Sequence, residues 1–148
     1  MESARGVSVQ ARGAADQGGP AGAVSLEAYA ESEGENTHSG NTVWQTKLTL
    51  APTLIAADYC IQWYMELYNS QSNRTTEAQL LIDAVPPADY GTLSTRFALP
   101  DVQGGFCGLK KLTLDAGVHT FVLQYRINDA VTGCTAKCRR ARLLLWRV

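Results

Sequence analysis

Charged residues, histidines and long apolar runs are all scarce in this sequence. Charged residues make up 18% of its 148 residues, against about a quarter in an average soluble domain. No apolar run approaches the roughly 20 residues that a helix needs to cross a bilayer, which excludes a transmembrane helix. Residues 1–20 contain no apolar segment after a basic start, so the sequence predicts no secretory signal and favours synthesis in the cytosol.

The sequence also lacks the residue patterns of a catalytic or metal site. Its two histidines, His38 and His119, are far apart in the chain, and no carboxylate lies at a spacing that would complete a metal site. There is no G-x-S-x-G motif, and Gly104-Gly105 lacks the lysine and the helix of a phosphate-binding loop. We therefore expect no enzyme activity, no catalytic residue, no metal and no cofactor. We expect His119 to point outward from a strand, beside a turn at Gly117.

The four cysteines, Cys60, Cys107, Cys134 and Cys138, do not form a recognisable motif either. Only the last two are close in sequence, and on a regular strand they would be about 13 Å apart, beyond the reach of a disulfide. A turn between them would close that gap, so a disulfide or a metal is an alternative, but cytosolic synthesis favours free thiols. We expect small buried or half-buried residues, with Cys60 as the first candidate for a reactive or interface thiol.

Acidic residues are concentrated near the start of the chain. Residues 1–42 hold two basic and six acidic residues, a charge of −4, whereas residues 43–148 hold eleven basic and eight acidic residues, a charge of +3. The first segment also has few large apolar residues, so it cannot bury enough surface to fold alone. The sequence therefore predicts an extended N-terminal arm over residues 1–42 and one domain over residues 43–148.

The arm contains one stretch with the alternation of a β-strand, from Val24 to Ala30. Its candidate contact residues are Val24, Leu26 and Tyr29. We interpret this stretch as a strand added to the sheet edge of a neighbouring molecule. The alternative is that the arm folds back on its own domain. The acidic run Glu31–Glu35 that follows is typical of a solvated linker.

The domain shows the two-residue periodicity of strands in seven places and no helical periodicity. Proline, glycine and aspartate separate these stretches as turn formers. The predicted strands cover residues 43–50, 58–69, 76–83, 93–99, 109–114, 118–127 and 139–148. This succession predicts an all-β fold, an antiparallel β-sandwich or jelly roll with an extended N-terminal arm.

Three stretches allow finer predictions. In residues 58–69, Trp63 falls on the apolar face and is expected in the core, whereas Tyr64 and Tyr68 fall on the opposite face as a contact surface for a subunit or a sugar. Residues 139–148 are too apolar on both faces for an exposed edge, so this strand is expected to be central or covered by another subunit. Residues 112–120 are expected to form a tight hairpin, in which Gly117 supplies a positive φ.

Basic residues gather near the C-terminus without acidic neighbours. Alternation places Arg140 and Arg142 on one face of the last strand, and the only aromatic residue close by is Trp146. Nucleic-acid binding would need more stacking aromatics, so no nucleic-acid partner is expected. An acidic arm from an adjacent subunit is a candidate partner for the two arginines, and a solvated charged face is the alternative. The candidate interface residues are Val24, Leu26, Tyr29, Tyr64, Tyr68, Arg140, Arg142 and Trp146.

Three strings in the domain, residues 56–67 (AADYCIQWYMEL), 114–126 (LDAGVHTFVLQYR) and 139–148 (RRARLLLWRV), together resemble small virion proteins of tailed bacteriophages. Those proteins are similar to the TNF-like and complement-type jelly rolls, which commonly form trimers. They serve as capsid decoration, head-fibre or tail-accessory subunits. The resemblance covers about residues 43–148 and does not extend to the arm.

The resemblance implies a structural, non-enzymatic protein of the virion. Its jelly roll would form a homotrimer, and its N-terminal arm would bind the shell, with the major capsid protein or another virion protein as partner. Several arms that grip adjacent subunits would make such binding durable. A receptor- or glycan-binding head-fibre or tail module on the same fold is the alternative. No membrane partner is expected.

Overall fold

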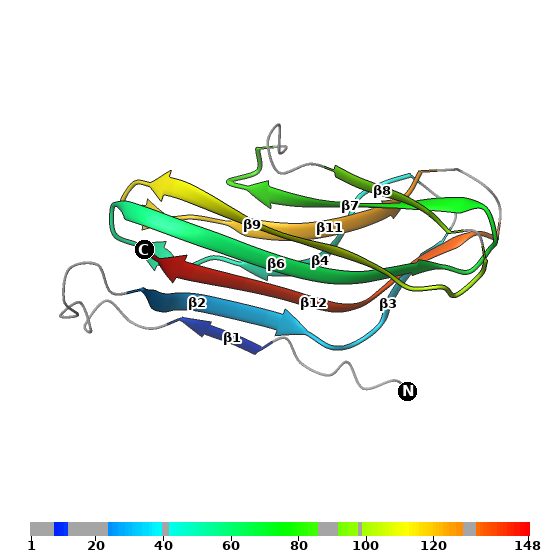
Figure 1. The fold of residues 1–148 in the computed structure, drawn as a ribbon, viewed down its shortest axis with the longest axis horizontal. Coiled ribbons are helices and arrows are strands. Elements are labelled where there is room, and N and C mark those ends of the chain that lie inside the picture. Colours follow the sequence, from blue (N-terminus) through cyan, green and yellow to red (C-terminus); the bar gives the residue numbers. More distant parts are fainter. Residues whose placement is uncertain (1–7, 12–23, 40–41, 86–91, 98, 129–132) are drawn as a thin grey trace.

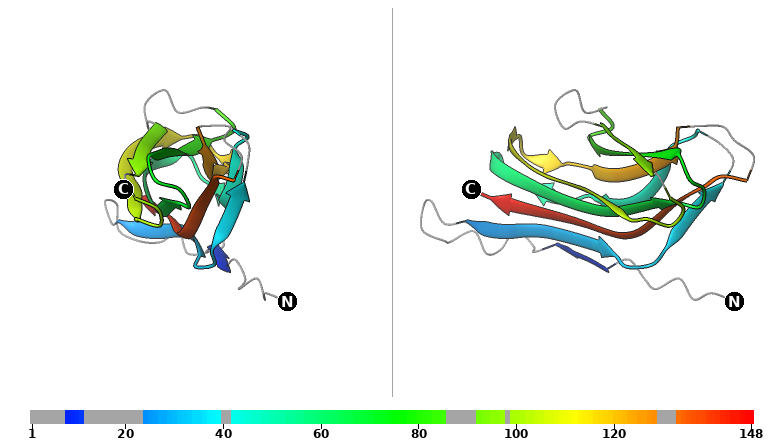
Figure 2. Two further views of the ribbon diagram at one scale, coloured as in Figure 1. Left: turned by 90° about the vertical axis from the view of Figure 1, so that its right-hand side faces the viewer. Right: turned by 45° about the vertical axis from the view of Figure 1, so that its right-hand side comes forward.

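The computed structural model describes residues 8–11, 24–39, 42–85, 92–97, 99–128 and 133–148, and every regular element within these ranges is a β-strand. All strand pairs are antiparallel. The strands form a six-stranded sheet and a four-stranded sheet that face each other as a sandwich (Figure 1), and Figure 2 shows the same sandwich from its end. The predicted all-β antiparallel sandwich is therefore confirmed.

The six-stranded sheet contains the first and the last strand of the chain. It consists of β1 (Ser8–Ala11), β2 (Ser25–Ser32), β3 (Asn36–Ser39), β6 (Ala57–Asn69), β9 (Gly104–Leu114) and β12 (Thr135–Arg147). Its strand order is β1–β2–β12–β6–β9, and β3 also pairs with β12. The last strand thus lies between β2 and β6, which confirms the prediction of a central final strand.

The four-stranded sheet covers the inner face of the larger sheet. It consists of β4 (Gln45–Leu50), β7 (Arg74–Ile82), β8 (Thr92–Phe97) and β11 (Phe121–Ile127), in the order β4–β11–β7–β8. A separate small ladder joins β5 (Thr53–Leu54) to β10 (Gly117–Val118). Each of the seven predicted stretches contains a strand, with ends that differ by a few residues, although the stretch 118–127 is interrupted at residues 119–120 between β10 and β11.

The core between the sheets follows from the alternation of the strands. Strand β6 turns Tyr59, Ile61, Trp63 and Met65 inward, and each is at most 5% exposed. The other large core residues come from both sheets and include Leu48, Leu50, Leu80, Phe121, Leu123, Tyr125, Ile127, Leu143 and Leu145. Burying a side chain of this size contributes about 1.5–3 kcal/mol. The predicted place of Trp63 in the core is confirmed.

Residues 25–39 belong to the six-stranded sheet of their own chain. Strand β2 pairs with the second half of β12, and β3 pairs with its first half. Ala28 and Ala30 are buried in the core, and Ala30 lies in register with Leu143. The alternative in which the arm folds back on its own domain therefore describes this segment. The expected linker shrinks to residues 33–35 between β2 and β3, and the division at residue 42 does not separate an arm from the domain here.

The predicted hairpin over residues 112–120 is wrong. Strand β9 pairs with β6 in one sheet, whereas β11 pairs with β4 and β7 in the other, so the segment crosses between the sheets. Gly117 does have a positive φ, 146°, as predicted. The predicted positive φ of Gly117 is therefore confirmed, but a turn at this residue does not determine which strand the following residues pair with.

Deletion of residues 1–42 is expected to destabilise the protein far more than deletion of residues 1–23. The longer deletion removes β2 and β3 and leaves one edge of β12 unpaired, whereas the shorter one removes only β1 from the described strands. For the longer deletion we expect a loss of several kcal/mol, which lowers the melting midpoint by about 10 °C or more or abolishes the cooperative transition. The shorter deletion should change it by about 3 °C or less. Circular dichroism melts measure both, and equal effects would contradict the place of residues 25–39 in the sheet.

A second prediction concerns the close contact between Trp63 and Gly108, which are register partners on β6 and β9. A Cβ at position 108 would lie 2.2 Å from Cζ2 of the Trp63 ring. Gly108→Ala is therefore expected to cost about 1–3 kcal/mol, because the packed core resists movement of the ring. Gly105→Ala is the matched control on the same strand, since a Cβ there would lie 3.8 Å from Tyr64. Urea unfolding that gives the same free energy for both variants would contradict the contact.

Candidate interaction face

The outer face of the six-stranded sheet brings together most of the residues that the sequence singles out. Two adjacent rows of register partners cross β2, β12, β6 and β9, and partners in register point to the same side of a sheet. The first row is Tyr29, Leu144, Gln62 and Leu109, and the second row is Glu31, Arg142, Tyr64 and Cys107. These eight residues are called the outer face below.

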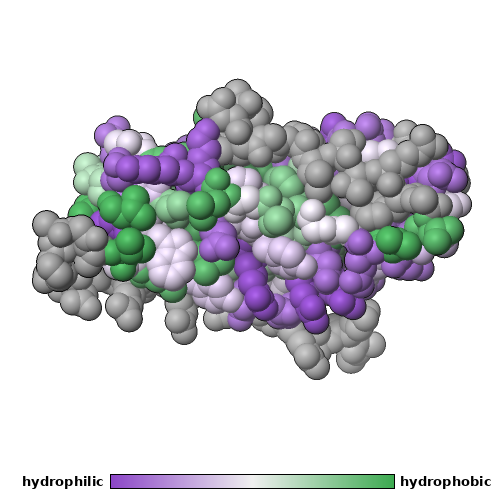
Figure 3. Space-filling model, viewed as in Figure 1, coloured by the Kyte–Doolittle hydropathy of each residue, from purple (hydrophilic) through white to green (hydrophobic). Residues whose placement is uncertain are grey.

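The other candidate interface residues lie beside these rows, with two exceptions. Trp146 is half-buried and is the register partner of both Leu26 and Cys60, and Arg140 contacts Glu33. Figure 3 shows this side of the molecule, with apolar side chains toward the end where β12 finishes and polar side chains across the middle. The exceptions are Val24, which is exposed before β2 begins, and Tyr68.

Tyr68 is buried, which corrects its expected place on the contact surface. Its side chain is 6% exposed, and its hydroxyl donates a hydrogen bond to Glu35 in the connection between β2 and β3. The ammonium of Lys137 lies 5.2 Å from the centre of the ring. Burial, helped by Glu35, raises the pKa of Tyr68. The alternation of β6 points Tyr68 outward, but Glu35 and Lys137 contact its hydroxyl and ring, so Tyr64 is the only one of the two tyrosines on the outer face.

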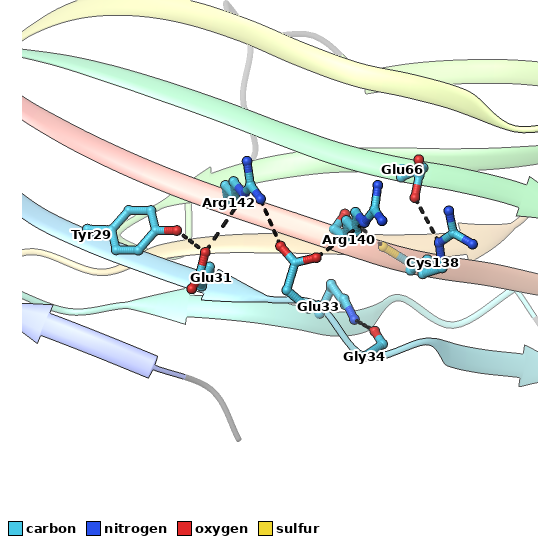
Figure 4. A network of polar contacts seen from close by, with 10 residues as sticks. Tyr29, Glu31, Glu33, Gly34, Glu66, Cys138, Arg140 and Arg142 are labelled. Atoms are coloured by element: carbon cyan, nitrogen blue, oxygen red, sulfur yellow. Dashed lines mark hydrogen bonds and ion pairs between the residues drawn. The ribbon is translucent and has the colours of Figure 1, made fainter. Parts of the chain in front are cut away.

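Glutamates of the N-terminal segment neutralise the arginines of β12 within one chain. Arg142 Nη2 lies 2.9 Å from Glu33 Oε1, and Arg142 Nε lies 3.8 Å from Glu31 Oε2. Arg140 Nε lies 3.2 Å from Glu33 Oε2, and Figure 4 shows how the three ion pairs run along β2 and β12. The expected acidic partner of the two arginines is therefore present, but it comes from the same molecule. Such exposed pairs contribute at most about 1 kcal/mol each.

Tyr29 is held at the rim of this charged row. Its hydroxyl donates a hydrogen bond to the carboxylate of Glu31, which also faces Arg142 (Figure 4). Burial and this hydrogen bond raise the pKa of Tyr29 to about 12. The hydroxyl therefore stays protonated at neutral pH, and its position is fixed by a partner two residues along the same strand.

An open depression of about 460 Å³ lies in the outer face. Its lining residues are Tyr29, Gln62, Trp63, Tyr64, Arg142 and Leu144. The volume falls within the range of small-molecule sites, roughly 300–1,000 Å³. Three of the candidate interface residues, Tyr29, Tyr64 and Arg142, thus meet around one hollow.

Lys47 is a buried charged residue that the sequence pattern did not single out. It is 5% exposed, and its Nζ donates hydrogen bonds to the carbonyl oxygen of Gly34 and, at 2.6 Å, to Oδ1 of Asn36. Burial lowers the pKa of Lys47. This contact attaches the β2–β3 connection to strand β4. Only the tertiary fold brings these residues together, so no local signal marks them.

His119 lies in the connection between β10 and β11, and not within a strand as expected. Its Nδ1 is 2.7 Å from Oδ2 of Asp83, and its Nε2 is 3.0 Å from the carbonyl oxygen of Asp115. Both neighbouring oxygen atoms are hydrogen-bond acceptors. The ring satisfies both by donating a hydrogen bond from each nitrogen, which requires the protonated, cationic form. The hydrogen bond to Asp83 raises the pKa of His119. The residue therefore ties three connections together, away from the outer face.

The four cysteines are free thiols, and two of them are buried as expected. Cys134 donates a hydrogen bond to Oδ1 of Asn69 at 3.2 Å, and burial raises the pKa of Cys138 to about 12. Cys60 is half-buried and Cys107 is exposed. The described residues contain no group of three or more histidine, cysteine or carboxylate side chains that could hold a metal ion. In the same ranges, no helix is long and apolar enough to cross a membrane.

The comparisons with known proteins found only a distant structural likeness. No protein family model and no curated protein matches the chain. Among solved structures, the insecticidal delta-endotoxin Cry8Ea1 from Bacillus thuringiensis is similar, with a TM-score of 0.42 and 8% sequence identity over 79% of this chain. The chain spans 19% of that toxin's length. A likeness of this degree carries no functional implication.

The His119–Asp83 contact makes a prediction about the pH dependence of stability. A histidine whose pKa is raised by folding stabilises the folded state at pH values below its ordinary pKa of 6.5. This contribution is lost as the pH rises through the raised pKa. Asp83 must also be ionised; burial opposes this, but hydrogen bonds from Thr120 and His119 lower its pKa below 3.8. His119→Gln should therefore destabilise the protein most near pH 5 and least above pH 8. The largest loss should be about 0.5 kcal/mol, because Asp83 is 43% exposed and the ion pair is screened by solvent.

Denaturant unfolding of the wild type and His119→Gln across this pH range measures the difference. His38→Gln is the control, because that histidine lies in β3, far along the chain from Asp83. A loss of stability in His119→Gln that is the same at every pH would contradict a charged His119.

Proposed function

We propose that this chain is a structural, non-enzymatic virion protein of the capsid-decoration type. It docks onto the shell or another virion protein with the apolar end of its six-stranded sheet, and its sandwich assembles as a homotrimer. The resemblance of residues 43–148 to small tailed-phage virion proteins supports the place in a virion. The geometry of the sheet supports the docking surface.

The observation that carries the docking surface is a group of exposed apolar side chains at one end of the sheet. The apolar end consists of Val24, Leu26, Leu109, Trp146 and Val148. Leu109 is 66% exposed and Val24 is 64% exposed. Exposed apolar groups on one face are typical of interaction sites.

The charges around the apolar end have partners within the chain, which supports an uncharged contact. Lys111 Nζ lies 2.8 Å from Oδ2 of Asp58, and Arg147 Nε lies 3.2 Å from Oε1 of Glu27. A partner that covers this end meets these charges already paired, and the cores of protein interfaces are depleted of charge. Because the acidic segment is part of the sheet of its own chain, we place the docking surface at the apolar end instead.

The proposal predicts that the chain copurifies with virus particles. Virus particles are produced from a genome that contains the gene for this chain and are purified on a density gradient. Their proteins are then quantified by mass spectrometry. We expect many copies of the chain per particle. Particles that lack the chain altogether would contradict the proposal.

The docking surface is tested with particles made without the chain, to which purified protein is added. Val24→Glu should reduce the amount bound at least about tenfold, because it places a charge on the apolar contact at a side chain that is 64% exposed. Thr49→Glu is the matched control, since Thr49 is exposed on the other sheet. Equal binding of the two variants would remove the apolar end as the docking surface.

A further inference from the structure

The depression in the outer face has two aromatic walls. Tyr29 stands on β2 and Tyr64 on β6, with β12 and its Leu144 between them. The two strands lie two strand spacings apart, about 10 Å, and Tyr64 stands one row further along them than Tyr29, so the two tyrosines lie diagonally across the depression. The Tyr64 ring passes over Gly105 of β9, where a side chain would begin 3.8 Å from Cε2. A flat, partly apolar ring fits between such walls.

Two polar groups in the depression are available to a ligand. Within the described residues, neither the amide of the exposed Gln62 nor the hydroxyl of the half-buried Tyr64 has a hydrogen-bond partner. An amide and a phenol both donate and accept hydrogen bonds. A sugar hydroxyl does the same, so the two groups suit neighbouring hydroxyls of one sugar ring.

The remaining polar groups of the depression are held in place before any ligand arrives. Tyr29 donates to Glu31, and Arg142 is fixed between Glu31 and Glu33 at 3.8 Å and 2.9 Å (Figure 4). Groups that are already ordered lose little conformational entropy on binding. The side chains that line the depression all stand on strands, and the depression is therefore preformed.

The charge balance of the site selects among sugars. Arg142 is the one cation among the lining residues, and two carboxylates, Glu31 and Glu33, already face it. A sugar that carries a carboxylate would meet these carboxylates without finding an unpaired cation. A neutral sugar avoids this repulsion.

A peptide is a weaker match to the same site. An extended peptide gains its affinity from backbone hydrogen bonds at a sheet edge, whereas the depression lies on the face of β12 and β6, whose backbone edges are both paired. Only side chains are offered to a ligand here. Aromatic and amide side chains on a flat face suit a ring with hydroxyl groups.

We propose that the depression between Tyr29 and Tyr64 binds one ring of a neutral saccharide. The ring lies against the tyrosines and Leu144, and its hydroxyls hydrogen-bond the Gln62 amide and the Tyr64 hydroxyl. This binding goes beyond the proposed docking of the apolar end, because docking does not need it. A virion protein with such a site holds a carbohydrate of a cell surface or of the surrounding medium.

The test is affinity electrophoresis of the full chain in native gels that contain a soluble polysaccharide. Three neutral polymers, a β-glucan, a galactomannan and a dextran, are compared with two uronate polymers, alginate and polygalacturonate. We expect at least one neutral polymer to retard the chain and neither uronate polymer to do so. No retardation by any neutral polymer, or stronger retardation by a uronate polymer, would overturn the proposal.

Variants then locate the binding. Tyr64→Ala and Gln62→Ala are each expected to weaken it about tenfold, the loss of one good contact, while Tyr64→Phe retains the ring and should lose less than Tyr64→Ala. Thr49→Ala on the other sheet is the control, and thermal melts verify that every variant is folded. Unchanged binding in both Tyr64→Ala and Gln62→Ala would overturn the site. The proposed function is tested separately, because Val24→Glu should still bind the polysaccharide while it fails to bind particles. Val24 precedes β2 and lines no part of the depression.

Discussion

The pairing of β12 along both of its edges is the constraint on which the rest of the structure depends. One edge pairs with β6 and the other with β2 and β3, so most of this 13-residue apolar strand has a backbone partner on both sides. An unpaired edge of this length and composition would invite association with other chains. The N-terminal segment therefore completes the sheet, and the same pairing places Tyr29 and Glu31 beside Leu144 and Arg142.

Much of the fold follows from the sequence because strand alternation is a local property. The alternation in β6 predicts which side chains enter the core, including Trp63, and the apolar composition of β12 predicts its central place. The sparse apolar content of residues 25–39 was misleading for a physical reason. Ala28 and Ala30 lie beside their register partners Leu145 and Leu143 on the inner side of the same sheet, so small residues fill the space that large neighbours leave. Low apolar content therefore did not mean low burial.

The parts that sequence could not predict depend on contacts between distant segments. Glu35 contacts the hydroxyl of Tyr68 and Gly34 contacts the amine of Lys47, and each of these two side chains would be exposed if alternation alone decided burial. The crossing between β9 and β11 has the same origin, since a turn at Gly117 suits a hairpin and a sheet-to-sheet crossing equally. For the outer face, alternation placed Tyr64 and Arg142 correctly on outward positions, but the glutamates that neutralise Arg142 were expected from another molecule.

The ion pairs that Glu31 of β2 and Glu33 of the following connection make with arginines of β12 have two effects. They align the N-terminal segment with the last strand, and they leave the outer face without an unbalanced cation. A face with unpaired arginines would attract nucleic acids and acidic proteins, whereas a face neutralised in this way favours contacts through apolar and hydroxyl groups. The same acidic segment that completes the sheet thus also sets the charge of this face, because without Glu31 and Glu33 the guanidinium of Arg142 would be uncompensated there.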